Sequence, residues 1–337
     1  DQLHQQGTDC YRLFHGSQEG AAGLTVDRYG PQLMVQSFHQ TLAADALLRI
    51  HELAMDSLEL PLQLVYNDRS QGNSRIDRSH AAYQPDAAAL ADQVGHEWGL
   101  AYRVRGRHDG QDPLLFLDLR NARGWVKQHS AGKSVLNLFS YTCGVGLCAT
   151  AGGARDVWNL DFAERNLAVG RENAALNPGL APMRFVRSDY FPAIRQLAGL
   201  PVASRRGRAL PDYPRLEQRQ FDLVLLDPPA WARSAFGTVD LLRDYQSLLK
   251  PALLTTAEGG MVTTQDDALA ARLRLLRSHF VDEASARIDV GISATIMERV
   301  LGIRMEARPA SVGAFAANLR AFESLRDFIA SATITTL

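Results

Sequence analysis

The chain has 337 residues, of which 46% are hydrophobic and 22% are charged, so it can bury a large core and is not intrinsically disordered as a whole. Its 36 Lys and Arg residues and 37 Asp and Glu residues give a formal net charge of −1, which excludes a chain-wide attraction to nucleic acid or to anionic membranes. Any basic contact surface is therefore local, and the length predicts about two domains.

Cysteine usage and the apolar segments narrow the class of protein. Cys10, Cys143 and Cys148 are too few for a disulfide framework and lack paired histidines at zinc spacing, so we expect a cytoplasmic protein without a metal site. The longest uncharged run, residues 134–154, contains four glycines and several polar side chains that lipid could not satisfy, so we expect no membrane span. Residues 1–30 hold four acidic residues and no apolar segment, which predicts no signal peptide.

The first third of the chain predicts a small α+β domain over residues 1–110. Apolar residues at helical spacing predict a helix over residues 42–60, and the polar residues 67–86 predict a long loop. Short β-prone runs, separated by Gly and Pro, occur at residues 11–15, 24–28, 33–38, 62–66 and 98–104.

The second domain, residues 111–337, alternates between predicted strands and helices. Near-continuous apolar strands are expected at residues 134–140, 156–162, 183–189, 221–227 and 260–265. Helices are expected at residues 119–129, 145–151, 163–176, 192–197 and 239–257. This alternation predicts a doubly wound, mostly parallel α/β sheet.

A basic loop separates the third and fourth of these strands. Residues 199–220 contain five arginines, three prolines and two acidic residues. Two interpretations are open: a solvent-exposed insertion, or a phosphate-contacting surface beside the site.

The turn that follows the first strand of the sheet is the strongest functional signal. Residues 135–146 have the sequence VLNLFSYTCGVG, a buried strand that enters a glycine turn and opens a helix. The free N–H groups of such a helix can bind an anionic or polar ligand. Because Gly144-x-Gly146 also fits a dinucleotide-binding fold or a plain tight turn, those alternatives stay open.

Acidic residues follow the next three strands. Asp161 could accept hydrogen bonds from ribose hydroxyls, and Ser188-Asp189-Tyr190 could hold an adenine amino group and stack on its ring. Helix N-capping is an alternative for both acids. After the fourth strand, Asp227-Pro228-Pro229 predicts a rigid edge that could grip a flat base, with Trp231 as either a stacking face or a core residue.

In combination, these segments resemble a class I S-adenosylmethionine-dependent methyltransferase. More narrowly, they resemble the bacterial large-subunit ribosomal RNA methyltransferases, with their cytosine-C5 and guanine-N7 branches. The segments that carry the resemblance are residues 137–144, Asp161, Asp189, Asp227-Pro-Pro, the FLDLRNAR sequence at residues 116–123, and residues 20–30. The resemblance implies a seven-stranded Rossmann-like methyltransferase sheet, and an N-terminal domain that contacts RNA or another substrate.

The resemblance also implies that S-adenosylmethionine binds across the strand ends. The turn would contact its amino-acid end, Asp161 its ribose, and Asp189 with Tyr190 its adenine. Asp227, Pro228 and Pro229 are the expected catalytic residues, because they would line the acceptor pocket. The implied cofactor-binding residues are Asn137, Phe139, Ser140, Tyr141, Thr142, Gly144, Gly146, Asp161, Phe162, Ser188, Asp189, Tyr190, Asp227, Asp118 and Arg120.

Departures from the family pattern bear on the acceptor atom. Cys143 replaces a family glycine, and Thr264 and Asp266 stand where the cytosine-C5 branch has cysteines. Carbon 5 of cytosine is not nucleophilic, so C5 enzymes first add a cysteine thiolate to the ring. No cysteine of this chain is expected beside Asp227 unless Cys143 turns into the pocket, so we favour a nitrogen of an RNA base over carbon 5.

Two other functions fit parts of the pattern. One is a nicotinamide- or flavin-dependent oxidoreductase that uses Gly144-x-Gly146 for pyrophosphate. The other is a catalytically degenerate methyltransferase core that binds RNA. The sequence leaves open the target nucleotide, the methylated atom, whether the substrate is free RNA or an assembled particle, and whether the protein is a monomer or a homodimer.

Overall fold

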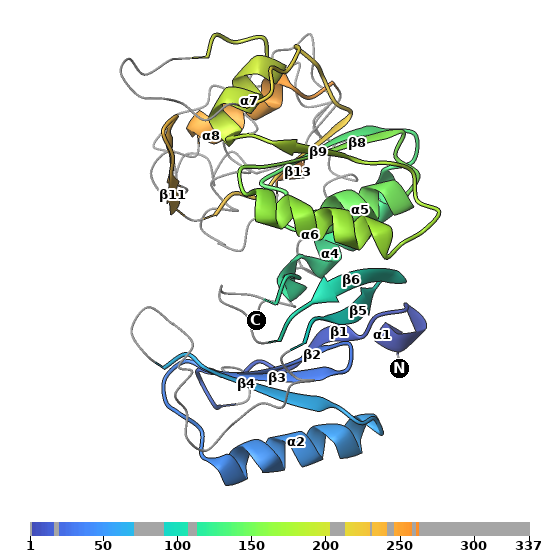
Figure 1. The fold of residues 1–337 in the computed structure, drawn as a ribbon, viewed down its shortest axis with the longest axis vertical. Helices are drawn as coiled ribbons and strands as arrows, with labels where there is room; N and C mark the ends of the chain where they lie inside the picture. Colours follow the sequence, from blue (N-terminus) through green and yellow to red (C-terminus); the bar gives the residue numbers. More distant parts are fainter. Residues whose placement is uncertain are drawn as a thin grey trace, which may run out of the picture. The chain divides into compact units, whose positions relative to one another are not determined.

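The computed structural model describes residues 2–16, 20–70, 91–106, 113–202, 213–229, 231–240, 246–257 and 261–262. They belong to two units, whose helices and strands are labelled in Figure 1. The first unit takes in Asp1–Arg120 and Glu172–Gly179, and the second takes in Asn121–Arg171 and Leu180–Leu337. The division after Arg120 lies beyond the predicted boundary at residue 110.

A four-stranded sheet with one covering helix forms the core of the first unit. The strands, in their order across the sheet, are β1 (Cys10–Phe14), β2 (Leu24–Tyr29), β3 (Gln32–Ser37) and β4 (Gln63–Asp68). β1, β2 and β3 pair antiparallel, whereas β3 and β4 are parallel and are connected through α2 (Ala44–Leu58). α2 lies along one face of this sheet (Figure 1), and its Leu47 packs with Leu33 and Val35 in the buried core. A short helix, α1 (Gln2–Gln5), precedes β1.

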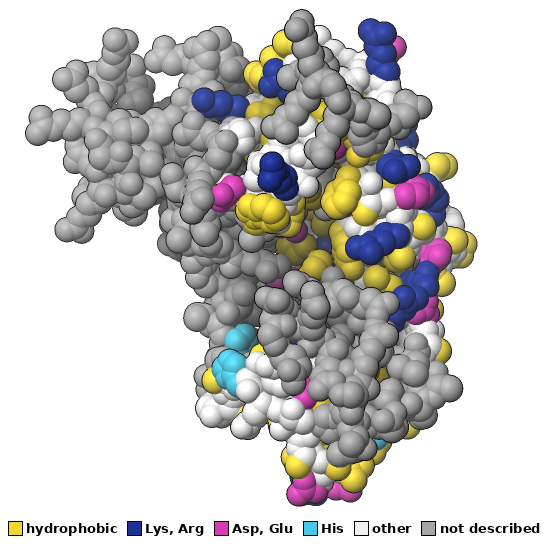
Figure 2. Space-filling view, turned by 60° about the vertical axis from the view of Figure 1, so that its left-hand side comes forward, with side chains coloured by type: hydrophobic (Ala, Val, Ile, Leu, Met, Phe, Trp, Pro, Cys, Tyr) yellow, Lys and Arg dark blue, Asp and Glu magenta, His cyan; other side chains and the backbone are white. Residues whose placement is uncertain are grey.

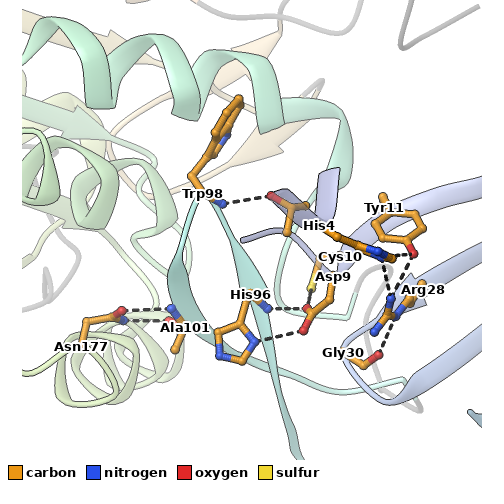
Figure 3. Close-up of polar contacts among 11 residues, drawn as sticks. His4, Asp9, Cys10, Tyr11, Arg28, Gly30, His96, Trp98, Ala101 and Asn177 are labelled. Carbon is orange, nitrogen blue, oxygen red and sulfur yellow. Dashed lines mark hydrogen bonds and ion pairs between the residues drawn. The ribbon is translucent and has the colours of Figure 1, made fainter. Parts of the chain in front are cut away.

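A hairpin of β5 (Gln93–Glu97) and β6 (Leu100–Val104) completes the strands described in this unit. Its two turn residues, Trp98 and Gly99, have φ angles of 55° and 74°, which match the type I′ turn that tight hairpins favour. Two asparagines bond the outer edge of β6. Asn177 both donates to and accepts from the Ala101 backbone (Figure 3), and Asn173 accepts from Arg103 N–H. We predicted β6 but missed β5, because its sequence QVGHE has only one large apolar side chain.

The second unit contains a five-stranded parallel sheet. Its strands are β7 (Ser134–Leu138), β8 (Asp156–Asp161), β9 (Arg184–Arg187), β10 (Leu223–Leu226) and β13 (Met261–Val262). They lie in the order β13-β10-β7-β8-β9, and every neighbouring pair is parallel. The Rossmann-like, mostly parallel α/β class is therefore confirmed. Residues 263–337, where two further strands are expected, lie outside the described residues, so the seven-stranded sheet stays a prediction.

Helices cover both faces of this sheet. α5 (Gly144–Ala151) and α6 (Glu164–Ala175) lie on one side, and α7 (Tyr190–Leu197) and α8 (Gln246–Leu254) on the other (Figure 1). Side chains alternate along each strand, so Leu136, Leu160 and Leu226 pack with α7 and α8 in one buried cluster. Coverage on both faces explains the near-continuous apolar strands of the sequence.

The first helix predicted for this domain agrees with the structure, whereas the last one begins later than predicted. α4 (Arg120–His129), which follows a 3₁₀ turn at Leu117–Leu119, matches the expected helix. The predicted start of the last helix at residue 239 is wrong, because residues 231–240 form a hairpin of β11 (Trp231–Arg233) and β12 (Thr238–Asp240). Val239 is apolar and fits the helical spacing, which explains the prediction, but it belongs to β12 and its side chain is buried.

Neither a membrane-spanning helix nor a cluster of metal ligands occurs among the described residues. None of the helices among them combines the length and the hydropathy needed to cross a membrane. That part of the chain also holds no group of three or more His, Cys, Asp or Glu side chains arranged to bind a metal ion.

Candidate active site

The carboxyl ends of four parallel strands bring the predicted site residues to one edge of the sheet. Leu226, Leu138 and Leu160 are paired across β10, β7 and β8. The next position along each strand is Asp227, Phe139 or Asp161, and Asp161 pairs in turn with Arg187 of β9. The strand order also reverses at β7, and open α/β sheets bind ligands outside the strand ends at such a reversal.

The turn between β7 and α5 has an unusual backbone. Phe139, Tyr141 and Cys143, none of them glycine, have φ angles of 54°, 49° and 63°. Left-handed backbone costs about 1–3 kcal/mol at a non-glycine residue and persists only where surrounding contacts hold it. Left-handed residues at alternate positions can also direct backbone N–H groups into a concave, anion-binding surface. Strain of this kind favours a ligand-binding turn over a plain tight turn.

Hydrogen bonds hold this strained turn in place. Ser140 N–H donates to the Leu160 carbonyl at 2.9 Å, and Cys143 N–H donates to the Ser140 carbonyl at 2.7 Å. Ser140 and Thr142 are buried, and Tyr141 is half-buried. The first of these bonds comes from β8, so the turn is fixed by the neighbouring strand as well as by its own sequence.

The second glycine of the motif is required by a neighbouring side chain. A Cβ at Gly146 would overlap the side-chain amide of Asn159, which is fully buried on β8. Asn137 donates from Nδ2 to Asn159 Oδ1 at 2.9 Å, so both asparagines are paired inside the sheet on the α5 side. The structure therefore explains Gly146 by packing and gives Asn137 a structural partner, whereas a ligand contact for either residue stays a prediction.

Replacing Gly146 with alanine should destabilise the protein by about 1–3 kcal/mol, because the added methyl overpacks the α5–β8 contact. Urea unfolding measures this loss. The double variant Gly146→Ala/Asn159→Ala should lose less stability than the sum of its single variants, because removing the amide makes room for the methyl. Strict additivity would contradict the proposed clash.

Asp161 fixes both the turn after β7 and the segment that leads into α6. One carboxylate oxygen accepts from Tyr141 N–H at 2.9 Å, and the other accepts from Ala163 N–H at 2.9 Å and Asn166 Nδ2 at 3.4 Å. Burial raises the pKa of Asp161, and these three hydrogen bonds offset part of the rise. Asp161 is not the N-cap of α6, because the backbone N–H groups that it accepts from belong to Tyr141 and to Ala163, both outside the helix. A carboxylate has about four acceptor positions, which leaves capacity for a ribose hydroxyl.

The variant Asp161→Ala should bind S-adenosylhomocysteine more weakly by about 1–3 kcal/mol, because it leaves polar groups of the ligand and the turn unpaired. Titration calorimetry measures the dissociation constant. Asp156→Ala is the matched control, since Asp156 lies at the other end of the same strand. An unchanged dissociation constant for Asp161→Ala would refute a role in binding.

Ser188, Asp189 and Tyr190, which follow β9, have structural roles. Asp189 accepts from Phe191 N–H at 2.9 Å and caps α7, and Ser188 is fully buried. Burial raises the pKa of Asp189, and its hydrogen bonds to Ser234 and to the α7 backbone lower it in part. Tyr190 is 4% exposed, stacks on Phe139 at a centroid distance of 4.9 Å and donates to the Leu248 carbonyl. This geometry favours a core role for Tyr190 over adenine stacking.

The residues that follow β10 are more exposed than those that follow β9. Asp227 is half-buried, Pro228 is buried and Pro229 is exposed. Trp231 is 64% exposed, so the alternative that it is a core residue is wrong and an aromatic face is available next to the prolines. Phe162, directly after Asp161, is likewise 60% exposed. Aromatic surface at two strand ends suits a ligand with flat rings.

Comparison with known proteins agrees with this geometry. The model of the S-adenosylmethionine-dependent methyltransferase family matches residues 70–288. The chain belongs to this family. The predicted family and its cofactor are therefore confirmed, and the oxidoreductase alternative is wrong.

Relatives of this methyltransferase add detail. It is 29% identical to ribosomal RNA large subunit methyltransferase I of Aeromonas hydrophila over 310 residues, which cover 88% of this chain and 70% of that protein. It is also 29% identical to ribosomal RNA large subunit methyltransferase K/L of Marinobacter nauticus, over 84% of this chain but only 37% of that protein. Among solved structures, SMU.776 complexed with SAH matches with a TM-score of 0.59 and 25% identity, over 77% of this chain and 61% of that one.

Cys143, which departs from the family pattern, is packed in the protein interior and is not exposed to a substrate. The thiol of Cys143 is 1% exposed and packs against Gly170 of α6, where a Cβ would press on the sulfur. Burial raises the pKa of Cys143 to about 12, only partly offset by a hydrogen bond to Ser140. At neutral pH this methyltransferase therefore holds Cys143 as a neutral thiol.

Native protein should resist alkylation at Cys143 by iodoacetamide at pH 9, because about one thiol in a thousand is ionised when the pKa is three units above the pH. Mass spectrometry of the labelled peptide measures this, and protein in urea, where the pKa returns to about 8.5, should react fully. Rapid native labelling of Cys143 would contradict the buried thiol.

The raised pKa of Cys143 also makes stability depend on pH. The stability contributed by Cys143 is complete below pH 8.5, the pKa of the unfolded thiol, and is lost as the pH rises toward 12.

The remaining predicted residues fall elsewhere. Asp118 and Arg120 belong to the first unit, where the Arg120 guanidinium lies 4.1 Å from the Trp98 ring centroid and donates to Gln6. Thr264 and Asp266, and residues 203–212 of the basic loop, lie outside the described residues. Sequence reasoning missed Asn159 and Gly170 as supports of the turn, and only the spacing of Asn159 opposite Asn137 on adjacent strands could have signalled one of them.

Proposed function

We propose that this methyltransferase transfers the methyl group of S-adenosylmethionine to a base nitrogen of large-subunit ribosomal RNA. One observation carries the proposal: Asp227 with its prolines is aligned with the strained turn and with Asp161 at the edge where the strand order reverses. The ribosomal RNA substrate is supported by the names of the relatives in Aeromonas hydrophila and Marinobacter nauticus.

Each side of this edge has a proposed part in the reaction. The backbone N–H groups of the turn and the Asp161 carboxylate would hold the cofactor, and SMU.776, a structural neighbour, was solved with SAH. When bound, the cofactor supplies an activated methyl group, so the protein mainly aligns the acceptor and excludes water. Pro228 and Pro229 would fix the plane of the base, and the Asp227 carboxylate would accept a hydrogen bond from an amino group on it.

The preference for nitrogen is supported by the state of the thiols. All three cysteines of the chain are buried. Burial raises the pKa of both Cys10 and Cys143. Addition to cytosine requires an accessible thiolate, whereas a base nitrogen with a lone pair can attack the methyl carbon directly as the carbon–sulfur bond breaks.

The decisive experiment compares modified nucleosides in large-subunit RNA from strains with and without the gene. Loss of one N-methylated nucleoside, restored in vitro by the pure protein with labelled S-adenosylmethionine, is the expected result. Loss of a 5-methylcytidine instead would refute the nitrogen acceptor. RNA binding without methyl incorporation would favour the degenerate RNA-binding alternative.

A further inference from the structure

A pocket of about 370 Å³ opens along β9, the last strand described on its side of the sheet. Trp158, Phe185, Pro214 and Leu216 contribute to its lining, and the charged residues that line it within the described part of the chain are Arg184 and Arg187. All of these residues belong to the second unit. A pocket of this volume is large enough to hold one nucleotide.

The two arginines of this β9 pocket have guanidinium groups available to a ligand. Arg184 is 64% exposed and its guanidinium lies 4.9 Å from the Trp158 ring centroid, and its one ion pair with a described residue is a long one, 3.8 Å to Asp156. Arg187 is exposed and makes no ion pair with any other residue that the structure describes. Arginine binds phosphate with two parallel hydrogen bonds, and aromatic or apolar surfaces accept the face of a base.

The position of the β9 pocket connects it to the candidate active site. Arg187 lies opposite Asp161 in the backbone register of β9 and β8. One end of the pocket is therefore at the row of strand ends that includes Asp227. From Arg184 to Arg187 the strand runs about 10 Å, and from β9 to β10 the sheet spans about 14 Å. A single strand of RNA with its target base at Asp227 could reach the pocket within a few nucleotides.

Charge on the visible surface is consistent with a local basic site. The face drawn in Figure 2 has Lys and Arg side chains interspersed with hydrophobic ones instead of one continuous basic patch. Because the net charge of the chain is −1, RNA must be drawn to such limited sites and not to the molecule as a whole.

We propose that the β9 pocket holds a nucleotide that flanks the target in single-stranded RNA. Arg184 and Arg187 contact its phosphates, and Trp158, Pro214 and Leu216 provide the apolar surface for its base. This inference rests on the proposed RNA substrate and adds the place where the strand beside the target is held.

The test compares the variant Arg184→Glu/Arg187→Glu with Arg49→Glu/Arg155→Glu, which changes the charge equally on exposed arginines outside the pocket. The probe is a fluorescein-labelled oligouridylate, titrated at several KCl concentrations and followed by anisotropy. Loss of two phosphate contacts should make the slope of log K against log salt shallower by about 1.4 and weaken binding at least about tenfold. The control should keep the wild-type slope, and S-adenosylhomocysteine binding should be unchanged in both variants.

Two results would overturn the inference. One is equal affinity and slope for the pocket variant and the control, and the other is displacement of the RNA by polyglutamate as readily as by unlabelled RNA, which would indicate an acidic peptide as the partner. Methylation of ribosomal RNA by the wild type is measured separately. If the wild type methylates RNA and the pocket variant has the same KM for RNA as the wild type, the inference about the pocket is wrong but the proposed function stands. If the wild type transfers no methyl group to RNA, and the pocket variant loses RNA binding while the control keeps it, the proposed function is wrong but the inference about the pocket stands.

Discussion

The variant Asp227→Ala should lose about 10²- to 10⁴-fold in the rate of methyl transfer, the usual effect of removing a group that accepts or orients a proton. The family resemblance also counts Asp227 among the cofactor-binding residues. We nevertheless expect the affinity for S-adenosylhomocysteine to stay nearly unchanged, because Asp227 follows β10, whereas the turn and Asp161, which would hold the cofactor, follow β7 and β8. A loss in kcat without a loss in cofactor affinity is therefore the expected signature.

Single-turnover transfer of labelled methyl groups to RNA from a strain lacking the gene measures this effect. The variant Asp227→Asn separates two roles of the carboxylate: an amide oxygen can still orient an amino group, but it cannot take its proton. Asp240→Ala, in the hairpin that follows, is the matched acidic control. Intact turnover by Asp227→Ala would remove Asp227 from the active site, and weakened S-adenosylhomocysteine binding would move it to the cofactor side.

The parallel sheet could be predicted from the sequence because each strand is buried on both faces. Runs such as Leu223–Leu226 are apolar throughout, so neither a helix nor an exposed strand competes with the assignment. Short hairpins have no such signal. β11 and β12 are three residues each, and the turn between them is closed by hydrogen bonds of Ser234 to the backbone of Phe236 and Gly237, so the whole hairpin is too short for a periodic apolar pattern.

The candidate site shows the same division. Residues that follow parallel strands must lie at one edge of the sheet, so the row of Asp227, Phe139 and Asp161 followed from topology alone. What each side chain does depends on packing: Tyr190 is directed into the core by its stacking on Phe139, and Asn159 determines that residue 146 must be glycine. These are contacts between segments far apart in the chain, and periodicity carries no information about them.

A buried ion pair in the first unit should have the largest effect on stability. Arg12 of β1 donates from Nε and Nη2 to the two carboxylate oxygens of Asp27 on β2, at 2.7 and 3.1 Å. Asp27 is 1% exposed and Arg12 39% exposed. Burial raises the pKa of Asp27, and the bonds from Arg12 offset part of that rise.

The variant Arg12→Ala should lose about 3 kcal/mol of unfolding free energy at pH 7, the lower end of the range for breaking a buried pair, because Arg12 is partly open to water. The loss has a defined pH dependence. Without Arg12 the folded pKa of Asp27 rises further above its unfolded value of about 3.9, so the neutral acid is favoured in the folded state. The penalty is therefore complete above the raised folded pKa and disappears as the pH falls toward the unfolded pKa.

Urea unfolding of the wild type and Arg12→Ala between pH 5 and pH 8 measures this dependence, with Arg49→Ala as a control for an exposed arginine. The double variant Arg12→Ala/Asp27→Asn should recover part of the lost stability at pH 7, because it leaves no charge in the core, and its residual loss should not vary with pH. A loss in Arg12→Ala that stayed constant across this range would show that Arg12 contributes packing alone, and that the Asp27 carboxylate is not the group whose burial the arginine compensates.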